Sequence, residues 1–200
     1  LKKKIILSTG MADMQEIGEA LKVLTKHGLS KKKIIVMQCN TEYPTPLRDA
    51  NLRAMISIKE KYGVSIGYSD HTEGVEAALA AAAMGAKIIE KHITLNKNLP
   101  GPDHKASISE KELKKMIEGI RKIVIALGNG IKKASPSEKK NIKVARNSII
   151  AAKDIKKGEK FTSRNLGIKR PGHGISPMKF FRVIGKIAKK NFIQDELIKL

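Results

Sequence analysis

The stretch Val64-Ser65-Ile66-Gly67-Tyr68-Ser69-Asp70-His71 decides the fold, because a short apolar run leads directly into a polar triplet. The same pattern returns at Ala86-Lys87-Ile88-Ile89, which is followed by Glu90-Lys91-His92. Both apolar runs are typical of buried strands. Side chains alternate between the two faces of a strand, so Ser69 and His71 share one side. By the same rule Glu90 and His92 share one side of the next strand. The sequence therefore predicts two histidines at one edge of a sheet.

Two further strand-and-helix pairs precede this stretch, and a helix follows each of its two strands. The pattern predicts strands at residues 5–7, 34–37, 64–68 and 86–89 and helices at residues 13–28, 50–62, 74–84 and 109–127. Strands that alternate with helices in this way are typical of βα units on a parallel sheet. A full (β/α)8 barrel needs eight such units in about 250 residues. We therefore expect either a small open sheet or the second half of a barrel, and the missing initiator methionine predicts a fragment.

The last third of the chain has a different pattern. Residues 129–146 lose apolar periodicity and gain lysine, serine and proline, which predicts a linker between a first domain at 1–128 and a second at 147–200. Short apolar runs and the turns at Lys157-Gly158 and Pro171-Gly172 predict a small, mostly β second domain.

The net charge of +21 on 200 residues raises the question of a polyanionic partner. The charge is concentrated at the end of the chain: residues 132–200 carry 19 lysines and arginines against 5 acids, and residues 1–131 carry 21 against 14. No zinc-ligand spacing or aromatic RNA-binding motif accompanies it, so we expect a solvated lysine-rich face and no specific nucleic acid. The sequence contains no run of about 18 apolar residues, so it predicts no membrane span. A single cysteine, Cys39, which we expect in the core, fits a reducing cytoplasm.

Several residues at the strand ends can carry chemistry. His71 and His92 can supply two neutral imidazole ligands to a divalent Mn, Fe, Co or Zn ion, or each can be held by hydrogen bonds. Glu90 can orient His92 or pair with Lys91. Hydroxyls at strand ends and side chains on two glycine- and proline-bearing loops can contact a ligand or serve the loops themselves: Ser8, Thr9, Ser69, Tyr43, Asp103 and His104. His27, beside the end of a helix, is expected to be structural.

Together these residues resemble the sialic acid synthase family. The resemblance rests on five motifs in order: Leu7-Ser8-Thr9-Gly10-Met11, Gln38-Cys39-Asn40-Thr41-Glu42-Tyr43-Pro44-Thr45-Pro46, Gly67-Tyr68-Ser69-Asp70-His71-Thr72, Ile89-Glu90-Lys91-His92 and Pro100-Gly101-Pro102-Asp103-His104. Residues 151–158, 165–166 and 169–186 resemble that family's SAF, or antifreeze-like, domain. The resemblance implies the second half of a TIM barrel followed by a small mostly-β SAF domain of the β-clip type.

The family resemblance also implies a reaction. Phosphoenolpyruvate would condense with the open-chain aldehyde of N-acetylmannosamine or a related amino sugar, giving a nonulosonic acid and phosphate. A divalent ion held by His71 and His92, Mn²⁺ with Mg²⁺ or Co²⁺ as alternatives, would polarise the aldehyde. Catalytic roles would fall to His71, His92 and Glu90.

The same resemblance implies substrate contacts. Ser8 and Ser69 would hold phosphoenolpyruvate, and Tyr43 and Asp103 would contact the sugar. Thr41 stands where some members carry a phosphoenolpyruvate-binding asparagine, and Asn40 is one place off. Arg170 resembles an arginine that one subunit delivers to its partner, which implies a domain-swapped homodimer.

The family's first four βα units, with its catalytic glutamate and phosphate-binding lysines, have no counterpart in this sequence, so we expect a truncated enzyme that is poorly active alone. The alternative from the tail charge is a non-catalytic basic module that binds carbohydrate or polyanions.

Overall fold

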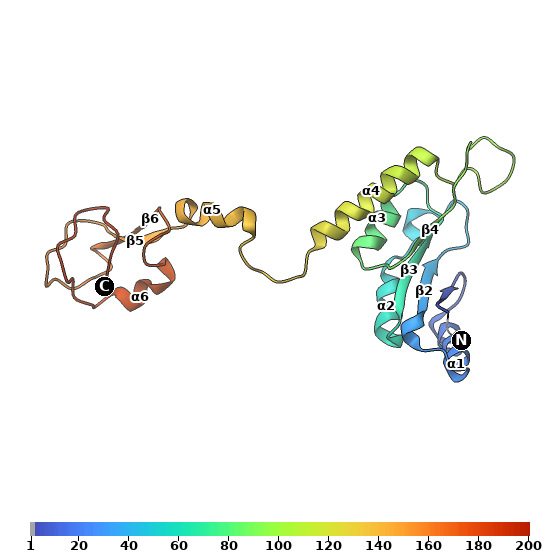
Figure 1. Ribbon diagram of the computed structural model, residues 1–200, viewed down its shortest axis with the longest axis horizontal. Helices are drawn as coiled ribbons and strands as arrows, with labels where there is room; N and C mark the ends of the chain where they lie inside the picture. The colour runs from blue at the N-terminus through green and yellow to red at the C-terminus, as the bar shows by residue number, and fades with distance from the viewer. Residues whose placement is uncertain (1–2) are drawn as a thin grey trace. The chain divides into compact units, whose positions relative to one another are not determined.

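The computed structural model describes residues 3–200 and divides into two compact units, Leu1–Gly130 and Ile131–Leu200 (Figure 1). The first unit alternates strands and helices as the sequence predicts. Its elements are β1 (Ile5–Ser8), α1 (Met14–Lys26), β2 (Ile34–Cys39), α2 (Arg53–Tyr62), β3 (Ser65–Asp70), α3 (Glu76–Ala83), β4 (Ile89–Lys91) and α4 (Glu110–Leu127). The four strands form one parallel sheet in the order β1-β2-β3-β4. The carboxyl ends of all four strands therefore meet at one edge.

All four strands continue into the polar residues that were predicted to follow them, and β1 runs through Ser8. β2 runs through Cys39, β3 through Asp70, and β4 occupies residues 89–91 in place of the predicted 86–89. The approach to β4 is held by single hydrogen bonds, from Lys87 N to the Ile66 carbonyl and from Tyr68 N to the Ile88 carbonyl. At the ends of β3 and β4 the polar side chains pair across the two strands, Ser69 with Glu90 and Asp70 with Lys91.

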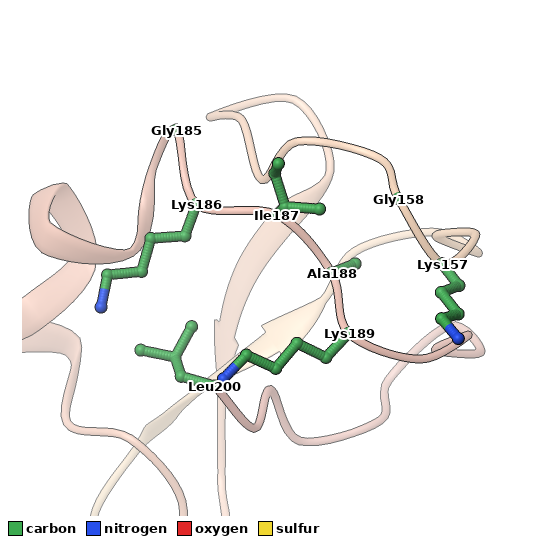
Figure 2. A pocket seen from close by; sticks show the side chains of 8 residues that line it. All are labelled: Lys157, Gly158, Gly185, Lys186, Ile187, Ala188, Lys189 and Leu200. Carbon is green, nitrogen blue, oxygen red and sulfur yellow. The ribbon is translucent and has the colours of Figure 1, made fainter.

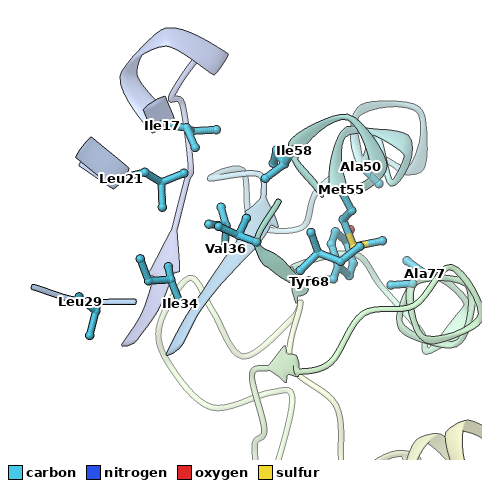
Figure 3. Close-up of a cluster of buried hydrophobic side chains, with 13 residues drawn as sticks. Ile17, Leu21, Leu29, Ile34, Val36, Ala50, Met55, Ile58, Tyr68 and Ala77 are labelled. Carbon is cyan, nitrogen blue, oxygen red and sulfur yellow. The ribbon is translucent and has the colours of Figure 1, made fainter. Parts of the chain in front are cut away.

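The helices cover one face of this sheet. Ile34 and Val36 of β2 and Ile66 and Tyr68 of β3 are buried on that face together with residues of α1, α2 and α3. Figure 3 shows Val36 and Tyr68 pointing from the sheet toward the helical side chains. Each fully buried aliphatic side chain of this kind contributes about 1.5–3 kcal/mol, so this layer holds the sheet in place.

The opposite face of the sheet carries the residues that alternate with the core positions. Adjacent strands align Ser8 with Met37 and Gly67, and one step further along they align Cys39 with Ser69 and Glu90. A Cβ atom on Gly67 would lie 2.9 Å from the Ile88 carbonyl oxygen and 3.2 Å from Met37 Cγ, so a larger residue there would push the strands apart. This face therefore brings the predicted polar residues to the carboxyl edge of the sheet.

Helix α4 begins at a capping box. Ser109 Oγ accepts a hydrogen bond from the Glu112 backbone, and the Glu112 carboxylate accepts from Ser109 N at 2.7 Å and Ser109 Oγ at 2.8 Å. Lys97, from the long loop after β4, lies 3.0 Å from the same carboxylate. These contacts, with the Ser109 amide as the largest, lower the pKa of Glu112 to about 2. One carboxylate thus joins the loop to the helix.

The stabilisation by Glu112 should depend on pH. Because its pKa is depressed in the folded state, the contribution is present above its ordinary value of 4.5 and is lost as the pH falls toward about 2. We expect Glu112→Gln to cost about 0.5–1 kcal/mol of unfolding free energy at pH 7, since the pair is partly exposed and screened, and to cost little at pH 2.5. Urea unfolding at both pH values measures this. Glu110→Gln, in the same first turn, is the control; an equal loss in both variants at pH 7 would contradict the capping argument.

The second unit is built around a two-stranded antiparallel sheet of β5 (Ser148–Ala151) and β6 (Leu166–Lys169). Isolated bridges join residues 150 to 197, 155 to 192 and 160 to 187. Its apolar core includes Phe161 and Phe192, whose ring centroids are 5.8 Å apart. The short helix α6 (Phe180–Val183) contributes the buried Val183 to this core. The predicted mostly β character of this region agrees with these elements.

A helix lies within the range that was predicted as a linker. Helix α5 (Pro136–Ala145) starts at a capping box between Ser135 and Glu138, with proline at its first position. None of its residues is buried, so the helix has no apolar stripe. Apolar periodicity therefore does not predict it. Three short 3₁₀ segments complete the elements: Lys31–Lys33, Leu47–Asp49 and Pro177–Lys179. Between residues 3 and 200, no helix has the length and apolar character to cross a membrane.

Candidate active site at the carboxyl ends of the strands

The two histidines meet at the carboxyl edge of the sheet. Their ring centroids are 5.2 Å apart, and the rings are nearly perpendicular. His71 directly follows β3 and is buried, whereas the His92 side chain, directly after β4, is 33% exposed. The strand alternation predicted this meeting: both rings lie on the same face of the sheet, and solvent reaches only His92 to a large extent.

The hydrogen bonds of His71 fix its tautomer. Its Nδ1 lies 2.5 Å from the backbone oxygen of Asn40, which can only accept, so Nδ1 carries the proton. In this tautomer the lone pair is on Nε2, which lies 3.4 Å from Ser69 Oγ. The Ser69 hydroxyl donates its own proton to Glu90 Oε1 at 2.6 Å. The Nε2 lone pair is thus available to an electrophile.

Asp103, from the loop after β4, is the carboxylate beside His92. Its Oδ2 lies 3.7 Å from His92 Nδ1. The loop is held by a hydrogen bond between Thr94 Oγ1 and His104 Nδ1 at 2.8 Å and by Ser107, which donates to the Asp103 carbonyl. Glu90 was predicted to orient His92 or to pair with Lys91; in the structure it binds Ser69 instead. Asp103 is therefore the carboxylate that lies beside His92 on the side of the loop, at a distance too long for a hydrogen bond.

Tyr43 lies over both histidines. Its ring centroid is 4.1 Å from that of His71 and 5.2 Å from that of His92. Desolvation raises the pKa of the Tyr43 hydroxyl, and the negative charge of Asp103 adds to the effect. The hydroxyl consequently stays protonated at neutral pH and remains a hydrogen-bond donor.

Other predicted residues lie outside this cluster. Ser8 is exposed at the end of β1 on the same sheet face. Thr41 is exposed, and its methyl group lies against Gly10, where an added Cβ would come within 2.6 Å. Cys39, a free thiol, is partly buried on that face, whereas it was predicted to lie in the core. His27 caps its own helix, with Nδ1 2.8 Å from the Val23 carbonyl, as expected of a structural histidine.

Arg170 belongs to the second unit, where it is exposed directly after β6. The loop that follows it is anchored by Ser148, whose hydroxyl donates to the Pro171 carbonyl at 2.6 Å and accepts from Gly174 N at 2.9 Å. Gly172 N donates to the Lys143 carbonyl of α5 at 2.7 Å. These bonds give the exposed arginine a rigid base.

Two contacts of His71 could not be read from the sequence. The Asn40 carbonyl binds its ring, and Thr45 N donates to its carbonyl at 2.9 Å. Both contacts are made by backbone atoms of the loop after β2. Every residue has these atoms, so the residue types do not indicate which of them will bind His71. A third missed feature is the pair of Asp70 and Lys91, which lies behind the histidines.

The donor set of this cluster suits a divalent cation in part. Within residues 3–200, no group of three or more His, Cys, Asp or Glu side chains converges to hold a metal ion. His71 presents a free Nε2 lone pair, and His92 stands opposite it with a carboxylate nearby. Two imidazoles at this spacing, one of them held by a backbone oxygen at Nδ1, fit a metal whose remaining ligands are oxygens of water or substrate.

A hollow of about 670 Å³ lies on the basic second unit. It is lined by Lys157, Gly158, Gly185, Lys186, Ile187, Ala188, Lys189 and Leu200. Figure 2 shows the ammonium groups of Lys157 and Lys186 on opposite sides of the hollow. The hollow therefore combines three lysines with an otherwise largely apolar lining.

A parallel α/β sheet with two histidines at its carboxyl edge, joined to a small mostly β unit, defines a two-unit α/β protein with its candidate active site at the strand ends. Comparison with protein families makes this specific. The model of the NeuB family matches residues 1–132, and that of the SAF domain matches residues 146–200. The chain belongs to the NeuB family, whose relatives include nonulosonic acid synthases, and residues 146–200 of its second unit match the SAF domain.

Individual relatives agree with this assignment. N,N'-diacetyllegionaminic acid synthase from Campylobacter jejuni is 55% identical over 199 residues, covering 100% of this chain and 60% of that protein. Pseudaminic acid synthase from the same species is 36% identical over 99% of this chain and 57% of its own length. The crystal structure of N-acetylneuraminic acid synthetase from Leptospira borgpetersenii, in complex with citrate, is similar with a TM-score of 0.63 and 40% identity. That match covers 70% of this chain and 48% of the Leptospira chain. This chain thus spans about 60% of the curated relatives' length or less.

Proposed function

We propose that this chain supplies the metal-binding part of a synthase that condenses phosphoenolpyruvate with an N-acetylated amino sugar. The observation that carries the proposal is the pair of histidines at the carboxyl ends of β3 and β4, with the Nε2 lone pair of His71 left available. In this proposal the four-stranded sheet is half of a TIM barrel, and the enzyme acts in the cytoplasm.

His71 and His92 would hold the divalent ion, with Mn²⁺ as the first candidate. When bound, the ion would supply Lewis acidity toward the sugar aldehyde. Asn40 keeps the His71 proton on Nδ1, and Asp103 lies beside the exposed side of His92. The protonated hydroxyl of Tyr43 can donate a hydrogen bond to a sugar oxygen.

The reaction would proceed by attack of the enolpyruvyl carbon on the aldehyde carbon, which forms the carbon–carbon bond. Water then adds to the former enol carbon, and the carbon–oxygen bond to phosphate breaks to release phosphate. Ser69 and Ser8 share the sheet face on which phosphoenolpyruvate would bind. The Glu90 carboxylate accepts a hydrogen bond from the Ser69 hydroxyl and so fixes the orientation of this hydroxyl on that face.

The sugar is proposed from the identities. The 55% identity to N,N'-diacetyllegionaminic acid synthase, against 36% to pseudaminic acid synthase, favours a diacetamido-trideoxy sugar of the legionaminic type, with N-acetylmannosamine as the alternative. Arg170 would reach the partner's active site in a domain-swapped homodimer. The anchored loop after Arg170 supports such a role, because a rigid base aims an exposed guanidinium at low entropic cost.

The test is phosphate release from phosphoenolpyruvate with either sugar, in Mn²⁺ and in excess chelator. The chain is assayed alone and together with the segment of the Campylobacter relative that it does not cover. We expect metal-dependent release with the added segment and far less without it. A folded mixture that releases no phosphate with either sugar contradicts the proposal.

The second candidate, a binding module for anionic polymers, is favoured by the charge of residues 132–200, which carry 19 basic against 5 acidic side chains. Retention on heparin through moderate salt would support it. Steep loss of binding with salt would mark the charge as a non-specific surface.

A further inference from the structure

An ion pair is buried directly behind the two histidines. Lys91 Nζ lies 2.9 Å from Asp70 Oδ2, and the two side chains are 1% and 0% exposed. The other oxygen of Asp70 accepts from Thr72 N at 2.9 Å and from Thr72 Oγ1 at 2.8 Å. Lys91 Nζ also donates to the Thr72 carbonyl. Every hydrogen bond of the pair therefore goes to the strands or the turn that present the histidines.

The position of the pair in the sheet links it to both histidines. Asp70 and Lys91 are aligned partners in the register of β3 and β4. His71 follows one and His92 follows the other, so each histidine is one residue beyond a buried charge. His71 also lies between Asp70 and Thr72, the two residues that Lys91 holds. A shift of either strand end would move one imidazole relative to the other.

The two faces of the sheet carry matching links. On the face of the histidines, Ser69 donates to Glu90 at 2.6 Å; on the helix face, the next aligned pair is Asp70 and Lys91. Alternating side chains place these links on opposite sides of the same strand ends. The ends of β3 and β4 are thereby clamped from both sides.

Stability alone does not account for a pair so deeply buried. Taking both charges out of water costs free energy that their attraction repays only with good geometry, and apolar replacements of such pairs are often neutral or stabilising. What an ion pair adds is a defined distance and direction between two strands, because its hydrogen bonds are directional and apolar contacts are not.

We propose that Asp70 and Lys91 are positioning residues that hold His71 and His92 at the spacing required to share one divalent ion. The inference rests on the proposed function for the metal. It assigns to the chain two residues that touch neither substrate nor ion and act through the histidines beside them.

The experiment compares the full chain with the variant Asp70→Asn/Lys91→Met. This double change removes both charges and leaves no unpaired buried ion, and the Asn oxygen can still accept from Thr72. Titration with Co²⁺, followed by its visible absorption, reports the metal site without any activity assay. We expect the folded double variant to bind Co²⁺ at least ten-fold more weakly, in line with the loss of outer partners at metal sites.

A control variant separates positioning from lost stability. Ile34→Ala creates a cavity at the amino end of β2, where Ile34 is fully buried. It should lower the melting temperature and leave Co²⁺ binding unchanged. Lys91→Arg keeps the charge and should recover part of the lost affinity. If the double variant binds Co²⁺ as tightly as the unchanged chain, the proposal is wrong.

A measurement without metal keeps the two proposals apart. Nuclear Overhauser contacts between the Tyr43 and His71 rings, 4.1 Å apart between centroids, and the ¹⁵N shifts of His71 report the pose of the ring. We expect the contacts to weaken and the Nδ1–H tautomer to be lost in the double variant. Their full retention overturns the positioning role. If the ring pose changes in the variant and the unchanged chain binds no Co²⁺, the proposed metal function fails while the positioning role stands.

Discussion

Replacing His71 by alanine should lower metal-dependent phosphate release by at least about 100-fold, the upper end of the loss that even an outer partner of a metal ligand causes. The reason is local: among the described contacts, only His71 has its tautomer fixed, because Nδ1 donates to the Asn40 carbonyl and the lone pair on Nε2 is left for a metal ion. His92→Ala should cause a loss of similar size, because a single remaining imidazole cannot hold the ion between the strands. The assay is the phosphate-release measurement with the completing segment present.

The matched control is His27→Ala, which removes an exposed histidine that binds only its own helix. Release by this variant should stay within about two-fold of the unchanged chain, since surface substitutions usually change stability by no more than about 0.5 kcal/mol. Co²⁺ titration of the same three variants checks the cause. Loss of phosphate release with Co²⁺ binding intact in His71→Ala would contradict a role as metal ligand.

The meeting of His71 and His92 was predictable because it needs only local rules. Apolar runs identify the strands, alternation gives the face, and parallel βα units bring the carboxyl ends to one edge. The order β1-β2-β3-β4 then follows from sequential pairing. Those rules do not predict which other side chains contact the two imidazole rings. The contact of Tyr43 with both rings is therefore known only from the structure.

The ends of the strands were harder to predict for a physical reason. Apolar periodicity stops at Tyr68, yet β3 continues through Asp70 because Lys91, on a strand 21 residues away, neutralises it. A polar residue in a strand is stable only with its partner, and the partner is set by register. The neighbour of Asp103 was equally hard to predict. The conformation of the long loop after β4 places Asp103 beside His92, and that conformation does not follow from apolar periodicity.

Helix α5 is a different case, because its evidence was present in the sequence. Ser135, Pro136 and Glu138 make a capping box with proline at the first helical position. A helix with no buried residue has little apolar periodicity, so the apolar pattern alone does not indicate this helix.

Phe161→Ala should unfold the second unit and leave the first one folded. Phe161 is fully buried in a core of few residues, and its ring meets Phe192 edge to face. Truncating a buried phenylalanine costs about 3–5 kcal/mol. A unit of this size has a total stability of only about 4–10 kcal/mol. The first unit has its own core around Val36 and Tyr68 and should keep its structure.

Amide resonances of both units, followed by NMR, measure this directly. The control is Phe181→Ala, whose side chain is 87% exposed and whose loss should leave all resonances in place. Co²⁺ binding by His71 and His92 should persist in Phe161→Ala, whereas phosphate release should fall if Arg170 must be presented by a folded SAF domain. Simultaneous collapse of both sets of resonances would show that the units fold as one, and unchanged phosphate release would remove Arg170 from the proposed mechanism.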